Sequence, residues 1–237
     1  MSKIADNLLS VKERIEKAAL KAGRDPGEVK LVVVSKTIEV EEIREAISAG
    51  ATILGESYVQ EAKEKIEEIG HQVGARRVVP LFWHMIGHLQ TNKVKQAVSM
   101  FDMFHSVDRK VLAEEIDKRA KQSGKRVSVL IQVNISHETT KSGIERDRAI
   151  SLVSEIANLT NIKVEGLMTM PPYFDDPEDA RSYFKSLREL KEEIEREGLE
   201  NISMRELSMG MSSDFEIAIE EGATIVRIGT AIFGERE

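Results

Sequence analysis

Two basic residues lie in apolar segments where a side chain could act chemically. Lys36 follows the run VVVS at 32–35, and Arg227 lies inside the run TIVRIGT at 224–230. Burial favours the neutral form of a lysine amine, and a neutral amine is what Schiff-base chemistry with a carbonyl requires. The alternative for Lys36 is a lysine at a strand end whose ammonium group extends into solvent.

Arg227 needs a partner if its strand is buried, because an unpaired buried charge is costly. One interpretation is a salt bridge to a carboxylate such as Glu56. The other is a fixed hydrogen-bond donor aimed at a ligand. Gly229 lies two residues further along and therefore shares the side of the strand on which Arg227 lies.

Small hydroxyl residues and glycines gather near the C-terminus. Ser208 and Ser212 belong to the segment SMGMSSD at 208–214, which leads into a helical pattern. Hydroxyls and free backbone N–H groups at such a place can bind an anion, although the same residues can serve as an ordinary N-cap. Gly229 allows close approach of a ligand to the backbone, and Thr230 adds a hydroxyl.

These residues lie at the ends of predicted strands. Apolar runs alternate with helical patterns, and several are apolar at successive positions, as is typical of parallel strands covered on both faces. The pattern predicts an α/β fold with eight strands, a (β/α)8 TIM barrel, whose loops after strands seven and eight often hold a phosphate group. The predicted strands span 31–37, 51–57, 81–87, 102–108, 127–134, 164–170, 205–210 and 224–230.

The predicted barrel lacks one outer helix. Only AIFGERE follows the eighth strand, too little for a helix of the usual length. The N-terminal segment has apolar residues at helical spacing (Ile4, Leu8, Val11 and Ile15), so we expect an additional N-terminal helix to cover that face. The alternative fold is a doubly wound open sheet.

Composition excludes several classes of protein. The 237 residues include no Cys, which excludes disulfides, thiolate nucleophiles and Cys-ligated metal sites. A net charge of −7 argues against general nucleic-acid affinity, and no apolar run is long enough to cross a bilayer. We expect a cytoplasmic protein with one domain, residues 1–237, and no metal site.

A reactive lysine, a phosphate cradle and an inward arginine around one barrel mouth suggest pyridoxal 5′-phosphate (PLP). Lys36 would take the aldehyde, the loops after strands seven and eight would take the phosphate, and Arg227 would meet the pyridine nitrogen. The same lysine and phosphate loops would also suit an aldolase that acts on a sugar phosphate through a Schiff base.

The sequence resembles the pyridoxal phosphate homeostasis protein family, a group of small PLP-binding barrels, over almost its full length. The motifs that carry the resemblance are VVVSKT at 32–37, LGESYVQE at 54–61, WHMIGHLQTNK at 83–93, QVNI at 132–135, KSGI at 141–144, GLMTM at 166–170, LSMGMSSDF at 207–215 and VRIGTAIFG at 226–234. The resemblance implies a fold like the N-terminal domain of alanine racemase, with PLP held as an internal aldimine on Lys36.

The resemblance also implies the cofactor-binding residues. These are Lys36, Ser57, Met168, Ser208, Ser212, Arg227, Gly229 and Thr230, with Arg227 facing the pyridine nitrogen. One departure is visible, because the second-strand motif of the family usually reads Gly-Glu-Asn and here reads Gly55-Glu56-Ser57. A serine hydroxyl can replace only part of an amide contact.

The resemblance implies storage and delivery of PLP, a part of amino-acid and vitamin B6 balance, with no robust catalysis. The alternative is a PLP-dependent amino-acid racemase of low activity. A racemase needs a second acid or base opposite the lysine, and we expect the domain that supplies it to be absent because the chain ends at Glu237. His84 and His105 are the internal candidates for that group, although a core histidine is the simpler interpretation of each.

The expected partners are PLP and PLP-dependent apo-enzymes as clients, with no nucleic acid and no membrane. We expect a monomer or a weak dimer. Lys141, in the KSG motif, is a candidate second amine for PLP capture, or an ordinary solvated lysine.

Overall fold

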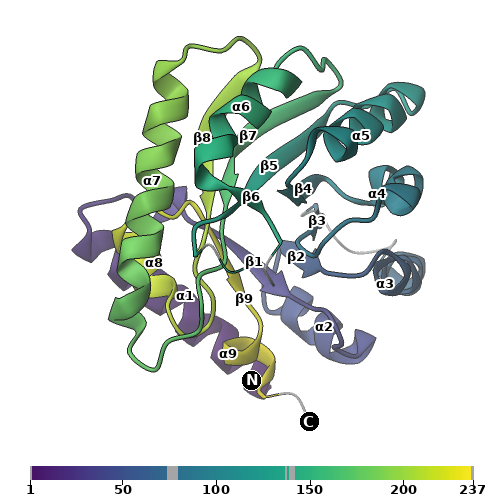
Figure 1. Ribbon diagram of the computed structural model, residues 1–237. Coiled ribbons are helices and arrows are strands. Elements are labelled where there is room, and N and C mark those ends of the chain that lie inside the picture. Colours follow the sequence, from purple (N-terminus) through teal and green to yellow (C-terminus); the bar gives the residue numbers. More distant parts are fainter. Residues whose placement is uncertain (1, 74–79, 137, 139–141, 236–237) are drawn as a thin grey trace.

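A closed ring of parallel strands forms the centre of the molecule (Figure 1). The computed structural model describes residues 2–73, 80–136, 138 and 142–235. Within these residues eight strands pair in a ring, and the pairing of β4 with β5 closes it. The strands are β1 (Lys30–Val34), β2 (Ile53–Glu56), β3 (Phe82–Met85), β4 (Met103–Val107), β5 (Val127–Asn134), β7 (Ile162–Met168), β8 (Ile202–Ser208) and β9 (Ile225–Ile228).

The closed ring confirms the predicted (β/α)8 barrel and rules out the open sheet. Each of the eight predicted strands overlaps an observed one. A two-residue strand that was not predicted, β6 (Ile144–Glu145), pairs with β5 outside the ring.

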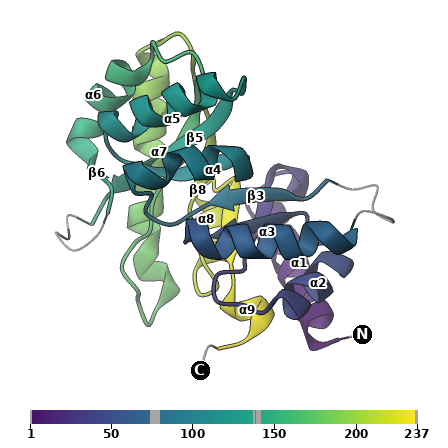
Figure 2. The same cartoon turned by 90° about the vertical axis from the view of Figure 1, so that its right-hand side faces the viewer.

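Helices surround the strands, and Figure 2 shows α3, α4 and α5 in turn along one side of the barrel. None of the helices in the described part of the chain combines the length and apolar character needed to span a membrane. The helices are α1 (Lys3–Lys21), α2 (Val40–Ser48), α3 (Val59–Val73), α4 (Val94–Met100), α5 (Lys110–Gln122), α6 (Arg146–Ile156), α7 (Arg181–Arg196), α8 (Phe215–Glu220) and α9 (Thr230–Phe233).

Helix α1 takes the place of the missing outer helix, as expected. Its predicted apolar stripe is buried, and it lies against α8 and α9 (Figure 1). The Asn7 amide donates to the Ile232 carbonyl at 2.9 Å, and the Arg14 guanidinium pairs with the Glu216 carboxylate at 2.6 Å. The first helix of the chain therefore covers the wall beyond β9, where α9 has only four residues.

The strand pleat divides the core into two layers. Alternate residues of each strand face the barrel interior, and the others face the helices. A small apolar cluster fills part of the interior, whereas a much larger one lies between strands and helices and includes Val33, Leu54, Val226 and Ile228. The interior cluster consists of Val32, Met103, Leu130, Met168 and Ile225.

Gly166 of β7 is required by a close approach of the neighbouring strand. A Cβ atom at this position would lie 1.8 Å from the backbone oxygen of Glu206 in β8. The register of β7 shifts just before this glycine against both neighbouring strands. The shift lies between Val129 and Leu130 in the pairing with β5, and between Val164 and Gly166 in the pairing with β8. The contact is made by backbone, so it cannot be relieved by rotation of a side chain.

We expect Gly166→Ala to lower the free energy of unfolding by about 3 kcal/mol or more, because the added methyl group forces β7 and β8 apart. The matched control is Gly70→Ala in α3, where nothing lies within 4 Å of the added Cβ. That substitution should raise the free energy of unfolding by about 1 kcal/mol, because alanine favours a helix over glycine. Urea denaturation of both variants measures the difference, and equal stability would contradict the backbone clash.

Candidate functional site

A pocket of about 850 Å³ opens at the carboxyl ends of the strands. Its wall is built by residues of the segments that come after β1, β2, β3, β7, β8 and β9, together with Val34 and Arg227 within strands. Parallel strands in a barrel bring all their carboxyl ends to one rim, which is where the fold places active sites. The pocket therefore lies where the sequence predicted the site.

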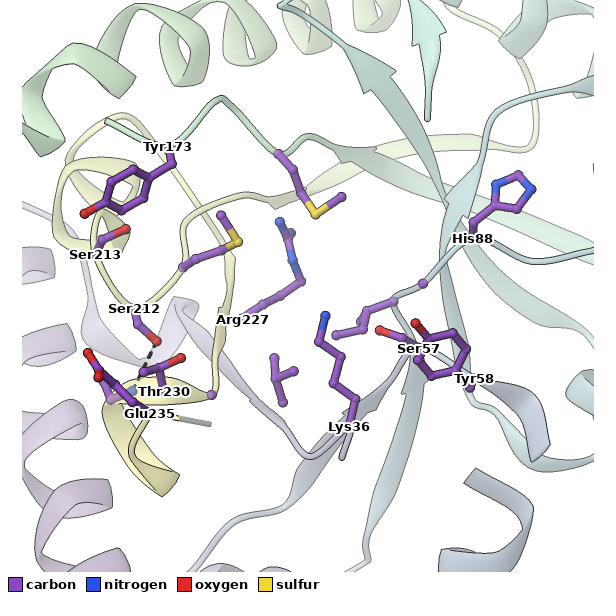
Figure 3. A pocket seen from close by; sticks show the side chains of 17 residues that line it. Lys36, Ser57, Tyr58, His88, Tyr173, Ser212, Ser213, Arg227, Thr230 and Glu235 are labelled. Carbon is purple, nitrogen blue, oxygen red and sulfur yellow. Dashed lines mark hydrogen bonds between the residues drawn. The ribbon is translucent and has the colours of Figure 1, made fainter. Parts of the chain in front are cut away.

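Lys36 and Arg227 point into the same space (Figure 3). Lys36 lies two residues beyond Val34, in the turn that follows β1, and both residues line the pocket. Arg227 reaches the same space from β9, which pairs with β1. The two cationic side chains of the predicted site are thus brought together by adjacent strands.

The hydroxyl groups of Ser212 and Thr230 lie on one side of the pocket (Figure 3). The Ser212 hydroxyl oxygen accepts the backbone N–H of Ala231 at 3.2 Å, which ties the loop after β8 to the loop after β9. Its O–H remains a donor. Gly229 contributes backbone without a side chain next to Thr230. This side of the pocket offers hydrogen-bond donors to an anion.

Ser57 and Tyr58 lie on the opposite side of Lys36 (Figure 3). Ser57 follows β2 and shares the inward side of Gly55, whereas Glu56 between them faces outward. Tyr58 is 63 % exposed and forms part of the rim. The short side chain of Ser57 therefore fills little of the pocket on this side, and the longer side chain of Tyr58 lies at the rim.

The pocket floor is held by a buried polar chain inside the barrel. The Arg227 guanidinium donates to the Ser208 hydroxyl at 2.5 Å and to the Thr169 carbonyl at 2.9 Å. The Ser208 hydroxyl lies 2.9 Å from Nδ1 of His105, and Nε2 of His105 lies 3.0 Å from Nδ1 of His84. Four side chains from β3, β4, β8 and β9 thus form one continuous hydrogen-bonded row.

Burial controls the charges along this row. It lowers the pKa of Arg227 to about 10, opposed by the carboxylate of Asp214, so the guanidinium keeps its charge at neutral pH. Burial lowers the pKa of His84 to about 3, and it lowers that of His105 well below the ordinary value. The arginine therefore carries the only charge in the row, and both histidines are neutral.

Two predicted site residues do not line the pocket. Ser208 is fully buried, and its hydroxyl is engaged by Arg227 and His105 beneath the floor. Met168 is fully buried in the interior apolar cluster. The structure does bring together the other predicted residues, which are Lys36, Ser57, Ser212, Arg227, Gly229 and Thr230.

The interpretation of Arg227 as the salt-bridge partner of Glu56 is wrong. The Glu56 carboxylate accepts from the Ser35 hydroxyl at 2.7 Å and from the Lys65 ammonium group at 3.1 Å. The physical reason is the pleat, because Glu56 faces the helices while Arg227 faces the interior. Carbonyl and hydroxyl oxygens satisfy Arg227 instead.

Several pocket residues were missed by sequence reasoning. Tyr58, His88, Tyr173 and Glu235 lie in the wall or at the rim, and each follows a predicted strand or the last short helix. Position just beyond a strand end was the available signal. His84 and His105 do not line the pocket, which supports the core interpretation. Lys141 lies outside the described residues.

A family profile and individual relatives both match this chain over nearly its full length. The family profile described as alanine racemase, N-terminal domain, matches residues 5–237. A protein of Aquifex aeolicus named pyridoxal phosphate homeostasis protein is 49% identical over 232 residues, which cover 98% of this chain and 98% of that protein. The protein of the same name from Escherichia coli K12 is 39% identical, with 100% and 98% covered.

Solved structures agree with this result. PipY of Synechococcus elongatus PCC7942, solved with PLP bound, has a TM-score of 0.84 and 33% identity, and the match covers 98% of this chain and all of that chain, 100%. An alanine racemase of Clostridium difficile 630 has a TM-score of 0.73 at 15% identity, and the match covers 98% of this chain and 57% of that one. The second likeness concerns the fold alone.

The neutral histidines predict a loss of stability in acid. In the unfolded chain His84 titrates near 6.5, whereas in the folded protein its pKa is about 3. Between these values the unfolded state binds more protons, so the free energy of unfolding falls as pH decreases below 6.5. From pH 6.5 to pH 5 the protonation of His84 in the unfolded chain should lower the free energy of unfolding by about 2 kcal/mol.

We expect His84→Gln to remove this contribution and to flatten the dependence on pH, as measured by urea denaturation at several pH values. The carboxyls of Glu56 and Asp214, whose pKa values burial raises, act in the opposite direction. Because they are common to both proteins, they cancel in the comparison. His88→Gln, at a side chain that is 46% exposed, is the control. An unchanged slope in His84→Gln would contradict a neutral buried His84.

Proposed function

The chain belongs to the pyridoxal phosphate homeostasis protein family, and we propose that it binds PLP in the pocket at the barrel mouth. The observation that carries the proposal is the convergence of Lys36, Arg227 and the hydroxyls of Ser212 and Thr230 on one space (Figure 3). PLP offers an aldehyde, a pyridine nitrogen and a phosphate. The pocket has a matching group for each.

Lys36 is the residue proposed to bond PLP. Its Nζ adds to the aldehyde carbon, a C=N bond forms, and the aldehyde oxygen leaves as water. Its position in the wall, with the side chain directed toward Arg227, supports this role. When bound in this way, PLP supplies an electrophilic imine that can exchange with other amines.

The phosphate is proposed to lie on the side of Ser212, Gly229 and Thr230. The Ser212 hydroxyl accepts from the N–H of Ala231, so its own proton is free to donate to a phosphate oxygen. Thr230 is exposed at the same wall and offers a second hydroxyl. Within the residues that line the pocket, the single carboxylate is Glu235, whereas Lys36 and Arg227 are cationic, which favours an anionic ligand.

Arg227 is proposed to face the pyridine nitrogen. Two of its nitrogens already donate to Ser208 and Thr169, which fixes the plane of the guanidinium, and a guanidinium has five N–H donors in all. A donor that stays charged keeps the pyridine nitrogen unprotonated, so the ring is a weak electron sink. This arrangement favours holding PLP over catalysis with it.

We therefore propose a cytoplasmic, single-domain PLP carrier that stores the cofactor and delivers it to apo-enzymes. Its partners are PLP and those client enzymes, and we propose a monomer or a weak dimer. Delivery is tested by mixing the loaded protein with a PLP-dependent apo-enzyme and following the recovery of its activity, with free PLP at the same concentration as reference. Sustained racemisation of an amino acid by the loaded protein would support the racemase alternative instead.

The Schiff base predicts an absorbance band that depends on Lys36. We expect the wild-type protein to show the band with PLP and to retain the cofactor after borohydride reduction. Lys36→Ala should lose both, because Lys36 is the one lysine among the described residues that line the pocket. Lys110→Ala is the control, since its side chain is 49% exposed in an ion pair with Glu155. A Lys36→Ala protein with an unchanged band would refute the covalent site.

The phosphate side is tested by comparing two ligands. We expect Ser212→Ala to weaken PLP binding about tenfold, the effect of one charge-assisted hydrogen bond. Binding of pyridoxal, which lacks the phosphate, should stay the same. Equilibrium titration of both ligands separates a phosphate contact from general damage to the pocket. Equal weakening for both ligands would contradict the assignment.

A further inference from the structure

A buried ionic cluster lies behind the loop that carries Lys36. Lys65, on α3, is only 6 % exposed. Its ammonium group donates to the Ser35 carbonyl at 2.6 Å, to the Glu61 carboxylate at 2.6 Å and to the Glu56 carboxylate at 3.1 Å. These three bonds use the full donor capacity of a lysine. The cluster was not visible in the sequence, and PLP binding as proposed does not use it.

The cluster holds the backbone on both sides of Lys36. On one side, the Ser35 carbonyl accepts from the Lys65 ammonium group, and the Ser35 hydroxyl donates to the Glu56 carboxylate at 2.7 Å. On the other side, the backbone N–H of Thr37 donates to Glu61 at 2.5 Å. Lys36 is thus the residue between two anchors, and both anchors end in the same group of charges.

The turn at Lys36 is strained, which explains why it needs anchors. The backbone N–H of Ile38 donates to the Ser35 carbonyl at 3.1 Å and closes a four-residue turn with Lys36 in second position. Thr37, in third position, has a φ of 59°. Turns with a positive φ at this position normally use glycine or asparagine, and a β-branched residue resists it. The bond from Thr37 to Glu61 holds the residue in that conformation.

Stability alone does not explain the cluster. The Glu56 carboxylate is fully buried, and burial raises its pKa. One of its two oxygens, Oε2, has no hydrogen-bond partner among the described residues. A buried ion pair with an unsatisfied oxygen contributes little net stability, and such groups are best known for fixing one conformation. The conformation that this cluster fixes is that of the Lys36 turn.

We propose that Lys65, Glu61 and Glu56 are positioning residues that hold the Lys36 turn so that the lysine amine enters the pocket ready to bond the aldehyde of PLP. The inference rests on the proposed function. It assigns the cluster to the covalent step alone, because the proposed phosphate and pyridine contacts come from β8, β9 and the loops that follow them. Covalent capture and non-covalent binding should therefore be separable.

The test compares Glu61→Ala with Glu64→Ala, a carboxylate on the same helix whose partner is the exposed amide of Gln60. PLP is added to PLP-free protein, and the rate of appearance of the Schiff-base band is measured. Glu61→Ala removes the bonds from Thr37 and from Lys65. We expect it to slow the appearance of the band by about fivefold or more, because one hydrogen bond alone accounts for about fivefold, and we expect Glu64→Ala to leave the rate unchanged. Both variants are checked for an unchanged melting temperature.

A second measurement separates positioning from general damage. In a Lys36→Ala background no Schiff base forms at residue 36, so titration with PLP reports the non-covalent contacts. Addition of Glu61→Ala to this background should leave the affinity unchanged. Lys65→Met should slow the appearance of the Schiff-base band further. If that variant fails to fold, the double variant Lys65→Met with Glu56→Gln takes its place, because it removes both buried charges together.

The outcomes are distinct. The positioning role would be overturned, while PLP binding stands, by either of two results. One is a wild-type rate of Schiff-base formation in Glu61→Ala. The other is a loss of PLP affinity in the Lys36→Ala background that is as large, in fold-change, as the loss of rate. A wild-type protein that forms no Lys36-dependent band would overturn the proposed function and this inference with it. Faster hydrogen exchange at the Thr37 amide in Glu61→Ala, measured without PLP, would support the anchoring directly.

Discussion

The guanidinium of Arg227 is charged and almost fully buried, and the interior of the barrel is arranged around that fact. An uncompensated charge at such a place costs several kcal/mol. Ser208 and the carbonyl of Thr169 supply oxygen acceptors, and His105 and His84 continue the row as neutral groups that add no second charge. The apolar cluster of the interior is small because this polar row takes up part of the space.

The two faces of the barrel wall divide the chemistry between them. Residues that face inward, such as Arg227 and Ser57, build the pocket, and residues that face outward, such as Glu56, meet the helices. The turn at Lys36 connects the two faces, because its side chain lines the pocket while its backbone neighbours bind the cluster on α3. A strained turn at this position is consistent with strain being stored at functional sites.

The same arrangement bears on the choice between carrier and catalyst. Both interior histidines are neutral, buried and away from the pocket wall, so they do not offer a second acid or base there. Of the side chains at the wall and rim that could move a proton, Tyr58 and Tyr173 are 63 % and 78 % exposed, the His88 side chain is 46% exposed, and Glu235 is exposed as well. Groups so open to water are weakly oriented, which suits exchange of a ligand better than a stereospecific proton transfer.

The sequence by itself determined the strands, the barrel and the rim on which the pocket lies, because apolar runs that alternate with helical patterns indicate parallel strands, and a parallel barrel places all carboxyl ends of its strands on one side. It therefore also determined that Lys36, Ser212, Arg227 and Thr230 meet. It did not determine which side of the wall a residue faces, since strands buried on both faces lack the alternation that would reveal it. For that reason Glu56 was considered as a partner of Arg227. The sequence also did not determine how deep along the barrel an inward residue lies, so Ser208 and Met168 were expected at the pocket and lie beneath it. Only the tertiary structure decided the positions of these residues and brought Lys65 of α3 behind the Lys36 turn. Strand register and helix packing set both, and neither leaves a local pattern in the chain.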